Sequence, residues 1–237
     1  DINFNENISF FPEIESAVNQ ANVIVLAVPS QHIRAVITKA KKHIDPSAII
    51  INIAKGIENE TLKIMSEVII EVNGSISNYV TLSGPSHAEE VVSNMPTAVV
   101  AASKNIEASK IVQDLFSTNK FRVYTNEDLI GVEICGSAKN VIAIAAGFCD
   151  GFGYGDNTKS ALITRGIKEV ARLGLKSGAK FETFFGLAGI GDIIVTCGSI
   201  HSRNRKLGER IGRGMTLGNA VGKSHMVVEG VELAFSI

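Results

Sequence analysis

Apart from Glu133, a single lysine is the only charged residue in a mostly apolar stretch, EICGSAKNVIAIAAG at residues 133–147. The apolar residues recur at helical spacing, so the stretch predicts a helix that is buried on most sides. Lys139 has Gly136 one turn before it and Ala143 one turn after it, so small residues line its face of the helix. Burial lowers the pKa of an ammonium group from about 10.4 towards neutral pH, where it can accept and donate protons. Lys139 is therefore a candidate acid/base, and the alternative is a structural lysine paired with a carboxylate.

Polar residues follow three apolar runs of the chain: PSQ at 29–31, NIAKG at 52–56 and SGPSHAEE at 83–90. In an open parallel sheet, ligands bind beyond the carboxyl ends of the strands. Lys55 is placed over such a cleft, with a solvated loop lysine as the alternative. GPS is in any case a turn signal, and Ser86 with nearby backbone amides could bind an anion or a cofactor amide.

A third group of polar residues lies in GLAGIGDIIVTCGSIHSRNRK at 186–206. Asp192 opens an apolar helical run, and Ser202, Arg203 and Asn204 begin the next one. A helix start with a guanidinium offers backbone N–H groups and positive charge to a phosphate. The equally open alternative is an N-cap serine followed by a solvated basic face.

The elements that must position these residues follow a strand-helix alternation. Continuous apolar strands indicate a parallel sheet covered on both faces, as in a doubly wound α/β domain. The expected strands are 22–30, 48–56, 79–86, 97–103 and 121–128, and the expected helices between them are 32–44, 60–72 and 105–117.

Helical periodicity with glycine punctuation replaces this alternation after about residue 129. We expect an all-helical second domain with helices at 131–150, 156–178, 181–187, 189–198, 202–213 and 216–223. The predicted division is a domain over 1–128 and a second, C-terminally incomplete domain over 129–237, packed closely together.

The bulk composition excludes several classes of partner. The 237 residues include 23 Lys and Arg against 24 Asp and Glu, which gives no electrostatic reason to expect nucleic acid or an anionic membrane. The three cysteines have no C-x-x-C spacing, which fits a reduced intracellular compartment, and the five histidines show no ligand-like pairing, so no structural metal is expected. No run approaches the ~20 apolar residues of a membrane helix, and no signal peptide pattern is present, so we expect a soluble protein.

A dinucleotide fingerprint is the motif that such a sheet should carry, but G-x-G-x-x-G does not occur. The glycines of GFGYGDN at 151–157 follow a helix and indicate a loop. The chain begins with Asp1 and ends in GVELAFSI, which reads as the middle of a helix. We therefore expect both ends to be cuts in a longer chain, with any fingerprint before Asp1.

Several long motifs follow one another along the chain: VIVLAVPSQHIR, NIAKGIE, LSGPSHAEEV, SAKNVIAIAAGFCDG, DNTKSALITRG and SRNRKLG. Together they resemble one known family, the NAD(P)-dependent glycerol-3-phosphate dehydrogenases. The resemblance covers almost the whole chain from about Asn22, with AGFCDG and DNTK closer to the eukaryotic branch and SGPSHA and VVEGVE closer to the bacterial one.

The resemblance implies a Rossmann-type doubly wound parallel sheet, lacking its first βαβ unit here, and an all-helical C-terminal domain of the 6-phosphogluconate dehydrogenase-like type. It implies interconversion of glycerol 3-phosphate and dihydroxyacetone phosphate, a step of glycerophospholipid and carbohydrate metabolism. The cofactor would be NAD, with NADP left open, because the segment that distinguishes them is not in this chain.

The resemblance also implies roles for individual residues. Lys139 would be the general acid/base at the C2 oxygen, with Lys55 and Asp192 completing the catalytic group. The substrate would contact Lys55, Gly84, Ser86, Asn140, Asp192, Ser202, Arg203 and Asn204. The cofactor would contact Lys55, Ala88, Arg203, Val227 and Glu229.

The family is usually dimeric and cytoplasmic, which sets the expectation for this chain. Two alternatives stay open from the sequence. One is another β-hydroxyacid-type dehydrogenase, which shares the two-domain plan and a helix lysine. The other is a non-catalytic dinucleotide-binding sensor that has kept the fold.

Overall fold

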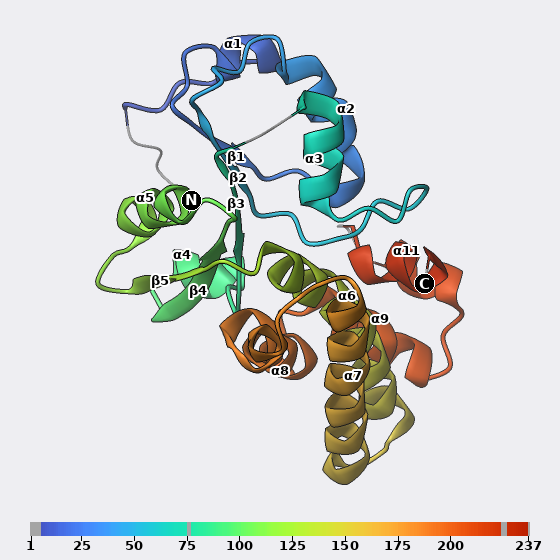
Figure 1. The fold of residues 1–237 in the computed structure, drawn as a ribbon. Coiled ribbons are helices and arrows are strands. Elements are labelled where there is room, and N and C mark those ends of the chain that lie inside the picture. Colours follow the sequence, from blue (N-terminus) through green and yellow to red (C-terminus); the bar gives the residue numbers. More distant parts are fainter. Residues whose placement is uncertain (1–5, 75–76, 224–226, 237) are drawn as a thin grey trace.

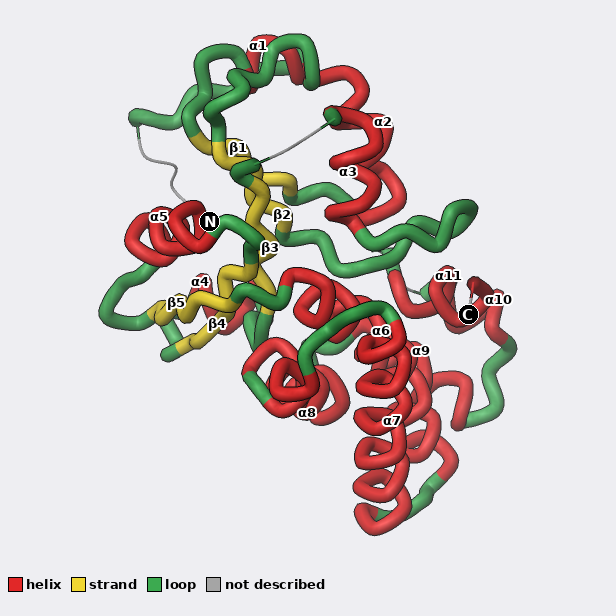
Figure 2. The backbone as a smooth tube through the Cα atoms, in the orientation of Figure 1, coloured by secondary structure: helices red, strands yellow, loops and turns green. Residues whose placement is uncertain are grey.

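The computed structural model describes residues 6–74, 77–223 and 227–236. A five-stranded sheet with helices on both faces is followed by a set of packed helices, and Figure 2 shows the strands gathered in one half of the molecule. The first half contains α1 (Ile14–Val18), β1 (Val23–Leu26), η1 (Ser30–His32), α2 (Ile33–Ala40), β2 (Ile49–Asn52), α3 (Met65–Asn73), β3 (Tyr79–Ser83), α4 (Ala88–Val92), β4 (Thr97–Ala102), α5 (Ile106–Phe116) and β5 (Phe121–Asn126). The second half contains α6 (Leu129–Phe152), α7 (Asp156–Lys176), η2 (Phe181–Phe185), η3 (Leu187–Gly191), α8 (Asp192–Gly198), α9 (Arg203–Gly212), α10 (Leu217–Gly222) and α11 (Glu229–Ser236).

Alternation along the strands places apolar side chains on both faces of the sheet. Ile50 belongs to a core shared with α2 and α3, whereas its neighbours Ile49 and Ile51 belong to a core shared with α5. Figure 1 shows α2 and α3 on one side of the strands and α5 on the other. The predicted covering of both faces is thus confirmed.

The strands run in the order β1-β2-β3-β4-β5, and one pairing differs from the expected parallel sheet. β1, β2 and β3 are mutually parallel, but β4 is antiparallel to β3, and β5 is parallel to β4. The chain turns back at the end of β3 through the five-residue helix α4, which stays at that end of the sheet instead of crossing a face. The carboxyl ends of β1, β2 and β3 therefore lie at one common edge.

The helix expected at 60–72 begins later than predicted. Residues 57–64 form a tight turn instead, with an isolated bridge between Ile57 and Ile64 and a hydrogen bond from the Glu58 amide to the Lys63 carbonyl. The Glu67 carboxylate then accepts a hydrogen bond from the Ile64 amide, which caps the start of α3. Three short elements, α1, η1 and α4, were not predicted, and the helix indicated by the last residues is α11.

Helix α6 is the central element of the helical half and packs against α7, α8, α9 and α11 (Figure 1). Its contact with α9 is close because glycines meet there: a Cβ atom at Gly147 would collide with the Arg205 carbonyl, and one at Gly208 with the Ile144 carbonyl. This approach fixes the start of α9 beside the middle of α6.

The expectation that no stretch has the length of a membrane helix is wrong for α6. Among the described residues, this one helix of 24 residues is long and apolar enough to span a bilayer by length and composition. However, 78% of its most apolar window is buried inside the protein. The apolar character of α6 is accounted for by its place in the core.

Candidate active site

One carboxylate lies between two lysines where the sheet meets the helical half. The Lys139 Nζ atom donates to Asp192 Oδ1 at 2.5 Å, and the Lys55 Nζ atom donates to Asp192 Oδ2 at 2.8 Å. Only 8% of the Lys139 side chain, 1% of Asp192 and 19% of Lys55 are exposed. Three residues that the sequence singled out separately therefore form one cluster.

Each member of this cluster comes from a different element. Lys55 follows β2 at the edge where the parallel strands end, and Lys139 lies in the middle of α6. Asp192 is the first residue of α8, directly after the π-helical turn η3. The space beside Gly136 is filled by Lys55 and Ser83: a Cβ at Gly136 would lie 3.1 Å from Ser83 Oγ and 3.6 Å from Lys55 Cγ.

The charges of the cluster do not balance when both lysines are protonated. Burial alone would raise the pKa of Asp192, but the ammonium groups of Lys55 and Lys139 outweigh it and hold that pKa below its usual value. Burial first, and the charge of Lys55 second, lower the pKa of Lys139 to about 7, although Asp192 opposes both. Lys139 can therefore exchange a proton near neutral pH.

The GPS turn provides the second side of the site. Gly84 has a φ of 147°, a conformation that L residues with a side chain rarely adopt, and its Cβ position lies 3.0 Å from the Val99 Cα atom. The Gly84 carbonyl accepts hydrogen bonds from Lys55 Nζ at 2.9 Å and from Ser86 Oγ at 3.1 Å. The turn thus holds the Lys55 ammonium in place.

The start of α9 contains the expected N-cap, and the phosphate site stays a prediction. Ser202 is the N-cap, because its buried Oγ accepts from the Arg205 amide at 3.2 Å. Arg203 is exposed and donates to the Val227 carbonyl at 2.8 Å. In this group the Arg203 guanidinium is the charge available to an anion.

Asn204 and Asn140 link the start of α9 to the centre of α6. Asn204 donates from Nδ2 to Asn140 Oδ1 at 2.9 Å and accepts at Oδ1 from the Gly230 amide. Asn140 Nδ2 lies 3.4 Å from Glu229 Oε2. Burial raises the pKa of Glu229, and the nearby charges of Arg203, Lys139 and Lys55 oppose that shift. These contacts connect the start of α9 to Glu229, which lies near both Arg203 and the lysine cluster.

Comparison with known proteins gives the family. Residues 1–109 match the model described as the NAD-dependent glycerol-3-phosphate dehydrogenase N-terminus, and residues 128–237 match the model of its C-terminus. A protein of Clostridium perfringens (strain SM101 / Type A) named glycerol-3-phosphate dehydrogenase (NAD(P)+) is 53% identical over 234 residues, which are 98% of this chain and 70% of that protein. The chain belongs to the NAD-dependent glycerol-3-phosphate dehydrogenase family.

Other members of this family agree with that assignment. A glycerol-3-phosphate dehydrogenase (NAD(P)+) of Clostridium botulinum (strain Alaska E43 / Type E3) is 56% identical over 95% of this chain and 68% of its own length. The crystal structure of glycerol-3-phosphate dehydrogenase from Coxiella burnetii has a TM-score of 0.94 at 38% identity, covering 98% of this chain and 71% of that one. The fold predicted from the resemblance, a Rossmann-like domain with a helical C-terminal part, is confirmed.

The family implies a nicotinamide cofactor, and two orphaned polar atoms at the common strand edge fit such a group. Ser83 Oγ and His87 Nε2 are buried and, in the part of the chain that the structure describes, have no hydrogen-bond partner. Burial first, and the Lys139 charge second, lower the pKa of His87, so a neutral imidazole faces the cluster. A cofactor or substrate with polar groups could supply the missing partners.

His87 and Ser83 were not predicted as site residues. The ring of His87 lies 6.1 Å from that of His201, centroid to centroid, so it bridges the GPS turn and the segment before α9. A histidine in a turn gives no signal by spacing alone. By contrast, the predicted Ala88 and Val227 lie at exposed positions, and no described contact of their side chains bears on the cofactor role.

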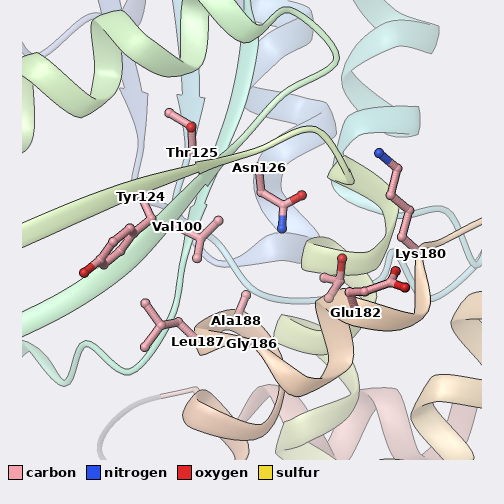
Figure 3. A pocket seen from close by; sticks show the side chains of 10 residues that line it. Val100, Tyr124, Thr125, Asn126, Lys180, Glu182, Gly186, Leu187 and Ala188 are labelled. Atoms are coloured by element: carbon pink, nitrogen blue, oxygen red, sulfur yellow. The ribbon is translucent and has the colours of Figure 1, made fainter.

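The cavity drawn in Figure 3 is separate from the predicted site residues. It has a volume of about 300 Å³ and lies between the strands β4 and β5 and the turns η2 and η3. Its lining residues are Val100, Tyr124, Thr125, Asn126, Lys180, Glu182, Thr183, Gly186, Leu187 and Ala188. The chemistry therefore has to be located from side-chain geometry and not from the shape of this cavity.

Within the described residues, no group of three or more His, Cys, Asp or Glu side chains is placed to hold a metal ion.

Proposed function

We propose that this protein interconverts sn-glycerol 3-phosphate and dihydroxyacetone phosphate with a nicotinamide cofactor. Its family is that of NAD-dependent glycerol-3-phosphate dehydrogenases, and its relatives carry that name. The observation that supports the chemistry is the Asp192 carboxylate held between Lys139 and Lys55. Such a cluster is suited to moving one proton near neutral pH.

In this proposal Lys139 is the general acid/base. As glycerol 3-phosphate is oxidised, neutral Lys139 accepts the proton of the C2 hydroxyl. In the reverse direction the Lys139 ammonium stabilises negative charge on the C2 oxygen and donates a proton to it. When bound, the nicotinamide supplies the acceptor or donor of the hydride.

Asp192 and Lys55 set the protonation and orientation of Lys139. The short hydrogen bond to Asp192 Oδ1 orients the Lys139 amine. The positive charge of Lys55 favours the neutral form of Lys139. Lys55 lies at the end of β2, where it reaches both substrate and cofactor in this proposal.

Substrate binding is assigned to residues around this cluster. Arg203 holds the phosphate by charge-assisted hydrogen bonds at the start of α9. Ser202 and Asn204 support it as the helix cap and as the link to Asn140, which itself lies beside the substrate. Gly84 and Ser86 line the substrate on the side of the GPS turn.

The cofactor is NAD in this proposal, and NADP fits the family name equally. The residues proposed to hold it are Lys55, Ala88, Arg203, Val227 and Glu229. Ser83 and His87 join them as the orphaned polar groups beside the cluster.

The proposal also covers the roles of the two domains, the cellular compartment and the oligomeric state. Residues 1–128 are the remaining part of the dinucleotide-binding domain, and residues 129–237 are the C-terminally incomplete substrate-binding domain. The enzyme acts on a small phosphorylated substrate in the cytoplasm and forms a homodimer, as expected of the family. Size-exclusion chromatography with light scattering measures the oligomeric state directly, and a monomer would contradict this part.

The deciding experiment is oxidation of NADH with dihydroxyacetone phosphate by the complete gene product, followed at 340 nm. The matched controls are unphosphorylated dihydroxyacetone and NADPH. Turnover that requires the phosphate supports both the reaction and the role of Arg203. Absence of turnover with either cofactor would refute the proposed function.

A further inference from the structure

A second buried carboxylate, Glu133, lies in the same helix as Lys139, two turns before it. It is 5% exposed and lies at the contact between α6 and the sheet. None of the roles proposed above involves it. A buried carboxylate is costly unless hydrogen bonds compensate its lost hydration, so its contacts need an explanation.

Four donors from two elements of the first half surround the Glu133 carboxylate. Oε2 accepts from the Ser66 amide at 3.1 Å and from Ser66 Oγ at 2.6 Å, at the start of α3. Oε1 accepts from Tyr79 Oη at 2.6 Å and from Thr81 Oγ1 at 2.7 Å, both on β3. Burial raises the pKa of Glu133, and these donors oppose the shift. The carboxylate thus links α6 to both β3 and α3.

The position of this network along β3 relates it to the lysine cluster. Tyr79, Thr81 and Ser83 lie on one face of β3, because side chains alternate along a strand. Glu133 contacts the first two, and Gly136, one turn further along α6, lies against Ser83. The next turn of α6 carries Lys139, and the residue directly after the strand is Gly84, whose carbonyl accepts a hydrogen bond from Lys55.

We infer that Glu133 is a positioning residue, which fixes the register of α6 on β3 and thereby the placement of Lys139 against Asp192 and Lys55. A buried polar group that specifies one register is a known use of such networks. A slip of α6 along β3 would move Lys139 with it, while Lys55 and Gly84 stay with the sheet. The inference rests on the proposed role of Lys139.

The test compares kcat and KM for dihydroxyacetone phosphate in two substitutions of Glu133. Glu133→Ala removes all four contacts, and we expect kcat to fall by about 10–100-fold, since a misplacement of about 1 Å costs on the order of 10²-fold. KM should stay within about threefold, because Arg203 is untouched. Glu133→Gln keeps the length and an acceptor oxygen, and its amide can donate to the Tyr79 and Thr81 hydroxyls, so kcat should return to within about threefold of the wild type.

A second pair of variants keeps the test decisive if Glu133→Ala does not fold. Thr81→Val removes one of the four donors to Glu133. We expect kcat to fall by about 3–10-fold, because Lys139 should be displaced less than in Glu133→Ala. Ser103→Ala is the matched control: its buried hydroxyl donates to the Tyr79 carbonyl at 2.5 Å but does not touch Glu133. It should lower the melting temperature and leave kcat unchanged.

The outcomes separate this inference from the proposed function. Wild-type kcat in folded Glu133→Ala, or equal kcat in Thr81→Val and Ser103→Ala, would overturn the positioning role. Lys139→Ala measured in parallel tests the function itself: if it is as active as the wild type, the role of Lys139 fails. If Lys139→Ala is inactive and the Glu133 variants are normal, only the positioning role fails.

Discussion

Replacing Asp192 with asparagine keeps the size of the side chain but removes the negative charge that both lysines contact. Asp192 is 1% exposed and binds Lys139 at 2.5 Å and Lys55 at 2.8 Å. Water cannot replace the lost charge at such a depth. The substitution therefore leaves two lysines facing each other without a carboxylate between them, and the neutral form of Lys139 becomes more favourable.

The size of the effect follows from the geometry. An opposite charge within about 4–6 Å shifts a pKa by ~1–3 units, and these contacts are shorter than that range. Burial and the charge of Lys55 lower the pKa of Lys139, and the charge of Asp192 raises it. The balance of these effects is a pKa of about 7. In Asp192→Asn we expect the pKa of Lys139 to fall by a further ~1–3 units. Asparagine offers one acceptor oxygen where Asp192 offers one to each lysine, so a looser orientation of Lys139 should also lower kcat by roughly 10²-fold.

The assay is the pH dependence of kcat for oxidation of glycerol 3-phosphate, which reports groups in the enzyme-substrate complex. Lys139 must be neutral to accept a proton, so wild-type kcat should fall as the pH drops below about 7. In Asp192→Asn this acid limb should move to lower pH by about 1–3 units, leaving a flatter profile at neutral pH.

A substitution of opposite sign serves as the control. The Lys55 charge lowers the pKa of Lys139, so Lys55→Met should raise that pKa and move the acid limb to higher pH. If the acid limb moves in opposite directions in the two variants, the charges of the cluster cause the shifts. A general loss of structure would not move the acid limb in opposite directions. An acid limb that stays in place in both variants would refute the view that these charges set the protonation of Lys139.

Further substitutions test the other parts of the site. Lys139→Ala should lower kcat by about 10²–10⁴-fold with the fold retained, because it removes the acid/base; stopped assays with circular dichroism check both points, and near-normal kcat would contradict the mechanism. Arg203→Ala should raise KM for dihydroxyacetone phosphate by about 10–100-fold with a small change in kcat, since it removes charge-assisted bonds to the phosphate; an unchanged KM in steady-state kinetics would contradict this. Gly84→Ala should destabilise the protein by about 1–3 kcal/mol, because φ is 147° and the new Cβ meets Val99 at 3.0 Å; thermal unfolding measures it, and an unaltered melting temperature would count against this strain.

Most of the element pattern could be predicted from the sequence, and two of the misses have different physical causes. The helices after residue 129 follow the predicted ranges closely because long periodic segments carry a strong signal. The helix expected from residue 60 begins at Met65, since the turn at 57–64 is stabilised by a bridge that no periodicity indicates. The direction of β4 depends on which end of the sheet the chain re-enters, and an apolar run reads the same in either direction.

Of the candidate site, too, the sequence predicted some residues and missed others. Lys139 stands out as a charge within an apolar helix. The same stretch contains Glu133, whose charge is equally visible in the sequence, but no role was predicted for it. His87 and Ser83 gave no such signal, because a histidine in a turn and a serine at the end of a strand are both ordinary. Their relevance comes from buried polar atoms that have no hydrogen-bond partner among the residues that the structure describes.

The sequence by itself determined the alternation of strands and helices, the motifs that identify the family and the residue types available for proton transfer and phosphate binding. These depend on neighbours along the chain, whose spacing is fixed by covalent geometry. Only the tertiary structure decided that Asp192 lies between Lys139 and Lys55, which are 53 and 137 residues away from it in sequence. The local apolar pattern already predicted the burial of Lys139, but the charges of Lys55 and Asp192, which also set its pKa, come from distant residues and depend on that packing.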